Sequence, residues 1–136
     1  DAALADVVAR AVRAFDRDLI LLAPALSELQ AAGQRAGLAV AAEIFADRAY
    51  TDAGTLVPRS RSGAVLHDAD AVVAHVMRML QAGGIVAASG KVLPTAMHSV
   101  CVHGDTPGAV DNARRLRAAL QAAGWRLTGL SEVVAG

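Results

Sequence analysis

The stretch LAVAAEIFADRAY, residues 38–50, joins an apolar strand to a run of charged and hydrogen-bonding groups. Residues 38–44 are almost continuously apolar, as is typical of a strand covered on both faces of a parallel sheet. Glu43 lies near the end of this strand, and Asp47 and Arg48 follow directly after it. In a barrel built of strand–helix units, groups that follow strands collect at one rim, where active sites lie.

A second run of the same kind, CVHGDTPG, spans residues 101–108. It follows a predicted strand over residues 99–102 and brings His103 and Asp105 to the end of that strand. Residues 106–107 are predicted to open the next helix. We therefore predict that the two runs are walls of one polar pocket, lined by Glu43, Asp47, Arg48, His103 and Asp105.

Strands and helices alternate along the rest of the chain. In the first half, the spacing of apolar residues, prolines and glycines predicts a helix over 4–15, a strand over 19–22, a helix opened by Pro24 and ended by Gly37, and the strand over 38–44. An irregular connection over 45–67 follows. The second half is predicted to hold a helix capped by Asp68 and ended by Gly83, a hairpin over 85–93, the strand over 99–102, a helix ended by Gly124, and a last strand over 125–127. This alternation indicates an α/β fold with a parallel sheet, open or closed, plus one β-hairpin.

Composition excludes some classes of protein. Lys plus Arg and Asp plus Glu number 13 each, so the formal net charge is zero, whereas a nucleic-acid-binding domain carries a basic excess. The sequence has no uninterrupted apolar run of about 18 residues, which a membrane-spanning helix needs. The one cysteine, Cys101, rules out an internal disulfide, and we expect a reducing cytoplasm. Its place within a strand predicts a buried, unreactive thiol.

The polar groups around residues 43–61 have structural alternatives. Glu43 would be either an exposed strand-end carboxylate or a functional group. Asp47 and Arg48 would form either a local ion pair, which is worth little at a surface, or part of a site. Arg59 and Arg61 would be either solvated loop charges or a clamp that holds a carboxylate or phosphate.

His103 and Asp105 lie between a buried strand and a helix N-terminus, where backbone N–H groups favour anions. Asp105 has the competing task of capping that helix, whereas His103 suits general acid–base catalysis. His75 is predicted on the outer face of its helix. No His-x-x-x-His or carboxylate pair has metal-ligand spacing, so we expect no complete metal site in this segment. Residues 89–91 lack the spacing of a phosphate-binding loop and are better explained as a hairpin turn.

Four runs together resemble one known family. They are AEIFADRAY at residues 42–50, GTLVPR at 54–59, GAVLHD at 63–68 and VCVHGDTPGA at 100–109. In their order, spacing and flanking helices they are similar to the LamB/YcsF family, also known as the A subunit of 5-oxoprolinase, across nearly the whole chain. Ala53 is a departure, because many members read Asp-Gly there, but it concerns only a loop.

The resemblance implies a seven-stranded β/α barrel related to glycoside hydrolases and deacetylases. It also implies an ATP-dependent hydrolase that opens 5-oxo-L-proline to L-glutamate with two partner subunits, B and C, and with Mg²⁺. The N-terminal motifs of the family are absent, and the chain begins with Asp1 rather than Met. We therefore expect residues 1–136 to be the C-terminal half of one barrel domain, inactive without the N-terminal half, with an apolar face or edge exposed where the missing strands belong.

For this chemistry, the resemblance suggests roles for the residues of the two runs. Glu43 or Asp105 would act as a base or metal ligand, and His103 would transfer protons. Asp47, Arg48 and Arg59 would bind substrate, with an arginine holding a carboxylate or phosphate. Two alternatives stay open: a metal-dependent hydrolase or deacetylase on a related barrel, and a non-catalytic regulatory subunit that binds a small acid.

Overall fold

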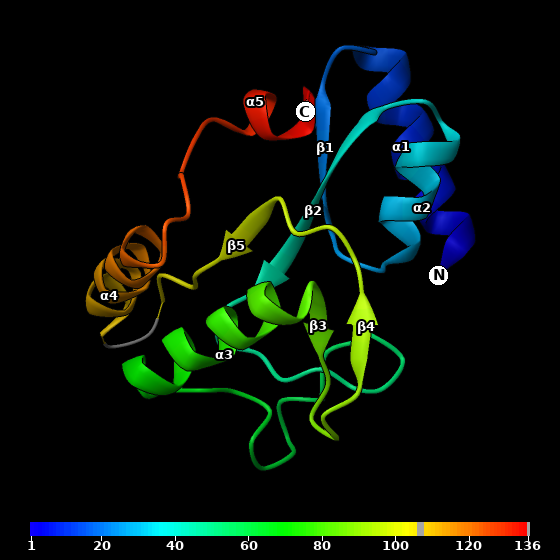
Figure 1. Cartoon of the computed structure of the whole chain (residues 1–136). Coiled ribbons are helices and arrows are strands. Elements are labelled where there is room, and N and C mark those ends of the chain that lie inside the picture. Colours follow the sequence, from blue (N-terminus) through cyan, green and yellow to red (C-terminus); the bar gives the residue numbers. More distant parts are fainter. Residues whose placement is uncertain (106–107, 136) are drawn as a thin grey trace. The chain divides into compact units, whose positions relative to one another are not determined.

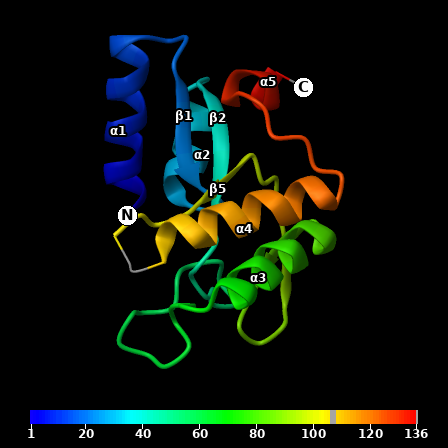
Figure 2. The same cartoon turned by 90° about the vertical axis from the view of Figure 1, so that its left-hand side faces the viewer.

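A computed structural model describes residues 1–105 and 108–135 of the chain (Figures 1 and 2). The helices are α1 (Ala2–Phe15), α2 (Glu28–Arg35), α3 (Ala69–Ala82), α4 (Ala109–Ala122) and α5 (Leu130–Ala135). The strands are β1 (Ile20–Pro24), β2 (Ala39–Phe45), β3 (Gly84–Val86), β4 (Val92–Pro94) and β5 (Ser99–Cys101). One sheet has the strand order β1-β2-β5, and β3 and β4 form a second sheet. The predicted α/β fold and the hairpin are thereby confirmed.

The chain divides into two compact units, which are described separately. Unit 1 comprises residues 1–44 and 96–99 and the described residues from 128 onward. Unit 2 comprises residues 45–95 and 100–127. Within the described residues, no helix combines the length and the apolar character that crossing a bilayer requires.

Unit 1 is built on the parallel pair of β1 and β2, in which Ile20 lies opposite Ala39 and Pro24 opposite Glu43. Helix α2 packs closely on these strands at Gly33. A Cβ atom added there would lie 2.6 Å from Cδ2 of Leu21 and 2.8 Å from Cγ2 of Val40. A side chain at position 33 would therefore force the side chains of Leu21 and Val40, or the helix itself, to shift.

Asp1 caps helix α1, because its carboxylate accepts from the backbone N–H of Leu4. It packs against α2 through small residues, because Ala5, Ala9 and Ala32 form one buried cluster. The larger apolar side chains of α1 lie on another face and are exposed to solvent: Leu4, Val7, Val8 and Phe15.

The start of α2 differs from the prediction. Pro24 does not open the helix but is the last residue of β1, where its fixed φ suits a strand end. The chain then turns through Leu26, at φ 63°, and Ser27 caps α2 by accepting from the N–H of Gln30. Gly37, at φ 70°, follows the end of the helix as predicted.

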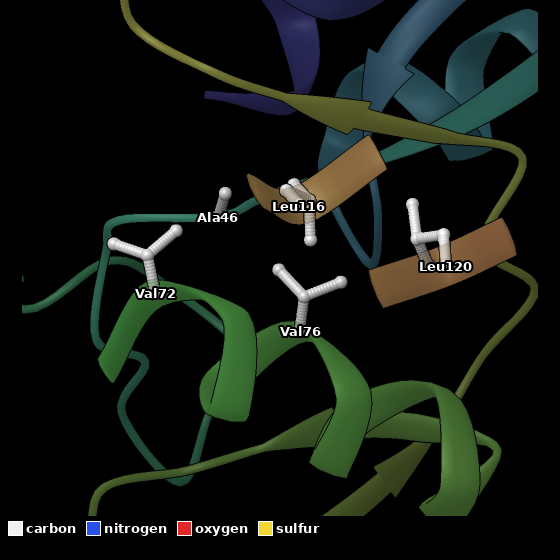
Figure 3. Packing of buried hydrophobic residues seen from close by; sticks show 5 residues of the cluster. All are labelled: Ala46, Val72, Val76, Leu116 and Leu120. Atoms are coloured by element: carbon white, nitrogen blue, oxygen red, sulfur yellow. The ribbon is translucent and has the colours of Figure 1, made fainter. Parts of the chain in front are cut away.

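The core of unit 2 lies where α3 and α4 pack together. Asp68 caps α3 through the N–H of Ala71, and Gly83 ends it in the left-handed conformation, both as predicted. Figure 3 shows side chains of the two helices pointing toward one another. The buried cluster consists of Ala46, Val72, Val76, Leu116 and Leu120. Ala46 comes directly after β2, so this core also fixes the residue beside Asp47.

Hydrogen bonds from its own side chains hold the irregular connection over 45–67 in place. The buried guanidinium of Arg48 donates from Nη2 to the carbonyl of Val57 at 2.9 Å and from Nε to that of Ala64 at 3.4 Å. The hydroxyl of Tyr50 accepts from the backbone N–H of Phe45 at 2.8 Å. Bonds of this kind let a long connection hold a fixed shape without regular strands.

The C-terminal third shows two corrections. Helix α4 begins at Ala109 with Gly108 as its N-cap, at φ 85°, and none of the described side chains caps it, so Asp105 does not take the capping position. Residues 106–107, predicted to open this helix, lie outside the described residues. Gly124, at φ 85°, follows α4 as predicted, but residues 125–127 form no strand and Trp125 is 46% exposed. The backbone N–H of Trp125 donates back to the carbonyl of Leu120 at 2.9 Å, so it closes the helix end and is not available to a sheet.

Candidate functional site

Asp47 and His103 meet in unit 2, although 56 residues separate them in sequence. Asp47 follows the end of β2, and His103 follows the end of β5. The Nδ1 atom of His103 lies 2.8 Å from one carboxylate oxygen of Asp47 and 2.9 Å from the other. The prediction that polar groups after these two strands come together is thereby confirmed for this pair.

The contacts of His103 fix its tautomer. An ionised carboxylate only accepts hydrogen bonds, so Nδ1 carries the proton and donates it to Asp47. Nε2 is then the ring nitrogen with the lone pair, and it makes no hydrogen bond with the described residues. The ring of Phe45 stacks on the imidazole with centroids 5.9 Å apart and planes at 16°. The carboxylate and the ring together hold His103 in one orientation.

A cavity of about 350 Å³ opens beside this pair. Its volume is near the lower end of the range of about 300–1,000 Å³ that small-molecule sites occupy. Polar and apolar groups share its lining: Ala46, Asp47, Val65, Leu66, His67, Val72, Val102, His103 and Asn112. All of them belong to unit 2. The cavity therefore combines one oriented acid–base pair with an apolar wall.

The other predicted site residues do not line this cavity. Glu43 belongs to unit 1, where its carboxylate accepts from the hydroxyl of Ser99 at 3.0 Å. Arg59 and Asp105 are exposed, and Arg48 is bonded to loop carbonyls. The predicted roles of these four residues stay predictions. For Arg48, the carbonyl partners favour a role in shaping the loop.

His67 and Asn112 are lining residues that the sequence pattern did not identify as part of the site. His67 lies just before α3, next to its cap Asp68. Asn112 lies in the first turn of α4, four residues after Gly108. Their position is the available signal, because His67 lies at the start of the helix that follows β2 and Asn112 at the start of the helix that follows β5. Asp47 and His103 come just after the same two strands, so all four positions follow the carboxyl ends of these strands.

A second cavity, of about 650 Å³, lies in unit 2 between α3 and the β3–β4 hairpin turn. His75 lines it and is buried, which corrects its predicted place on the outer face of the helix. Its Nε2 lies 3.1 Å from the carbonyl oxygen of Arg48, and its Nδ1 lies 3.4 Å from a guanidinium nitrogen of Arg78. A tertiary contact explains the difference, because the connection over 45–67 covers His75 on α3.

These contacts make His75 the opposite tautomer to His103. A carbonyl oxygen only accepts, so Nε2 of His75 carries the proton, and Nδ1 accepts from Arg78. Burial lowers the pKa of His75 below its ordinary value, and the charge of Arg78 lowers it further. The hydrogen bond to Arg48 and the charge of Asp47 act in the other direction, and burial outweighs them.

The described residues contain no cluster of three or more His, Cys, Asp and Glu side chains that would hold a metal ion. Magnesium prefers several oxygen ligands in near-octahedral geometry. The carboxylate of Asp47 is already bonded to His103, which leaves the cavity without such a set. The described residues of this chain thus do not fit a Mg²⁺ site on their own.

Comparison with known proteins gives consistent results. The family described as LamB/YcsF family matches residues 1–135. A protein of Azoarcus sp. (strain BH72), named as the A subunit of 5-oxoprolinase, is 72% identical over 133 residues, which cover 98% of this chain and 52% of that protein. A protein of the same name from Methylococcus capsulatus is 46% identical over 136 residues, or 100% of this chain and 52% of the relative.

A crystal structure of a lactam utilization protein from Thermus thermophilus has the same fold, with a TM-score of 0.82 and 33% sequence identity. The match covers 93% of this chain and 50% of that structure. The chain thus spans about half the length of the relatives that it matches. Because the family match extends over nearly every residue, the chain belongs to the LamB/YcsF family.

Proposed function

We propose that this chain forms part of a lactam-opening hydrolase, the A subunit of an ATP-dependent 5-oxoprolinase. Its reaction converts 5-oxo-L-proline to L-glutamate while ATP becomes ADP and phosphate. The names of the relatives support this proposal, as does the named lactam utilization protein of the same fold. We also propose that the chain completes a seven-stranded barrel together with a segment that corresponds to the other half of its relatives. The proposed enzyme works in the cytoplasm with partner subunits B and C and with Mg²⁺.

The observation that carries the proposal is the Asp47–His103 pair at the wall of a small cavity. A lactam carbonyl is a poor electrophile, so the reaction needs activation of the carbonyl and of the attacking water. In the proposed reaction, the terminal phosphoryl group of ATP passes to the amide oxygen. Water then adds to the ring carbon, the ring C–N bond breaks, and a second water releases the phosphate.

His103 is the proposed general base for the first water. Its Nε2 lone pair accepts a proton as the water oxygen bonds to the ring carbon, and the protonated ring then gives a proton to the departing nitrogen. Asp47 holds the ring in the required tautomer and stabilises the imidazolium that forms. This gives Asp47 a positioning role in place of the predicted contact with substrate. Glu43, Asp105, Arg48 and Arg59 stay candidates for substrate or phosphoryl contacts.

The test uses a chimera in which this chain replaces the matching half of the Azoarcus protein, combined with the B and C subunits of that organism. The measurements are glutamate formation and 5-oxoproline-dependent ATP cleavage. We expect His103→Gln to abolish most of both, whereas His75→Gln, a matched change in the same unit, should leave most activity. Glutamate formation that does not depend on His103 would contradict the proposal. Binding of 5-oxoproline without turnover would instead support a non-catalytic binding subunit.

A further inference from the structure

We propose that the carboxamide of Asn112 recognises the amide of the lactam ring, and thereby selects cyclic amides in the cavity of Asp47 and His103. This inference rests on the proposed function and assigns the group that determines its specificity. Asn112 lines the cavity from the first turn of α4. It is half-buried, and its side chain makes no hydrogen bond with the described residues.

The place of Asn112 in the helix leaves its side chain available. Its backbone N–H bonds the carbonyl of Gly108 at 2.9 Å, an ordinary helical bond, so the main chain needs nothing from the side chain. Asn is a poor residue for a helix interior compared with Ala. Among the described residues no side-chain nitrogen or oxygen is both buried and without a partner, so the carboxamide of Asn112 is reached by solvent and is open to a ligand that enters the cavity.

The chemical match lies in the geometry of the ring. A five-membered lactam holds its amide cis, so its C=O and N–H point from the same edge. A carboxamide also presents an N–H donor and a C=O acceptor side by side, so the two can form a pair of parallel hydrogen bonds. Arginine only donates and a carboxylate only accepts, so neither would satisfy both groups of the ring.

The rest of the cavity suits the remaining atoms of such a ring. Val65, Leu66, Val72 and Val102 supply an apolar wall for ring methylene groups. His103 and Asn112 line the same small cavity, so an amide held by Asn112 would lie near the proton-transfer group. The opened product has an ammonium group and a carboxylate in place of the cis amide. It therefore loses the paired hydrogen bonds, which favours its release.

The test compares two ligands that differ in one group. They are 5-oxo-L-proline and its lactone analogue, in which a ring oxygen replaces the N–H. Dissociation constants are measured by titration calorimetry on the Azoarcus chimera with its B and C subunits. We expect the unaltered chimera to prefer the lactam by about tenfold, the scale of one lost neutral hydrogen bond. In Asn112→Ala the preference should fall to near unity, because the acceptor for the N–H is gone.

Asp111→Asn is the matched control, because it changes a neighbouring exposed residue of the same helix turn that pairs with Arg115. It should keep the tenfold preference. Alanine has a high helix propensity, so Asn112→Ala should fold. The preference of the unaltered chimera for the lactam over the lactone gives a further reading that needs no variant.

An equal loss of affinity for both ligands in Asn112→Ala, or an unchanged preference, would overturn the inference while 5-oxoproline turnover still supports the proposed function. The same holds if the unaltered chimera binds lactone and lactam equally. Failure of the unaltered chimera to bind 5-oxoproline at all would overturn the proposed function, and this inference with it.

Discussion

His75 and His103 are two histidines of unit 2 with opposite surroundings. His75 is buried, and both of its ring nitrogens have protein partners, the carbonyl of Arg48 and the guanidinium of Arg78. His103 gives one nitrogen to Asp47 and keeps the other on the side of a cavity, with a quarter of its side chain exposed. The difference separates a histidine that stabilises the fold from one that is placed for proton transfer.

The largest expected effect is on turnover at His103. His103→Ala in the Azoarcus chimera should lower glutamate formation by about 100-fold or more, the scale of a lost general acid–base group. The melting temperature should change little, because the ring is partly exposed and adds little to the core. Near-normal turnover in a folded variant would remove His103 from the chemistry. A large drop in melting temperature would show instead that its contacts hold the segment after β5.

Asp47→Asn should lower kcat by about 10- to 100-fold, the usual range for a group that orients a functional side chain. The neutral amide can either accept from or donate to Nδ1 of His103, so it neither imposes one tautomer nor stabilises the imidazolium. KM for 5-oxoproline should therefore change much less than kcat. If KM rises strongly while kcat stays the same, Asp47 contacts the substrate rather than positioning His103.

The pairing of Asp47 with His103 follows from a rule that can be read in sequence. Both residues come directly after apolar strands, and such positions meet at one edge of a parallel sheet. The order of helices and strands was equally readable, because period and capping residues are local signals. Asp68, Gly37 and Gly124 each end or begin a helix where their backbone chemistry predicts it.

The errors have a common physical origin in contacts between distant segments. Helical spacing alone puts His75 on the outer, solvent-facing side of α3, because it does not show that residues 45–67 cover this position. Pro24 fits a helix start and a strand end equally well on local grounds, and pairing with Glu43 decides between them. Asn112 belongs to no sequence motif, and only its position at the start of the helix after β5 points to the cavity.

The next effect concerns stability at His75. His75→Ala should lower the free energy of unfolding by about 1–3 kcal/mol, because it leaves the buried carbonyl of Arg48 without its donor and opens space in the packing. Urea unfolding of the chimera measures this. His67→Ala, a change at an exposed histidine near the start of α3, is the control and should alter stability by less than about 0.5 kcal/mol. Equal losses in the two variants would contradict a structural role for His75.

The smallest expected effect is the pH dependence that His75 adds to stability. Its pKa in the folded protein lies below the ordinary value of 6.5, so the unfolded chain binds the proton more readily. Stability from this residue is therefore unaffected well above pH 6.5 and falls as the pH drops below that value. His75→Gln should flatten the dependence of unfolding free energy on pH in this range. A slope that is identical in the variant would show that His75 does not contribute.

The tautomers of the two rings test most directly whether His103 is set for proton transfer. Nitrogen-15 NMR of the chimera with labelled histidine, near pH 8 and so above the ordinary histidine pKa of about 6.5, distinguishes protonated from unprotonated ring nitrogens. We predict the proton of His103 on Nδ1 and that of His75 on Nε2. In Asp47→Asn, His103 should lose its strong preference for the Nδ1 form. A proton on Nε2 of His103 in the unaltered chimera would contradict the assignment of that nitrogen as the proton acceptor.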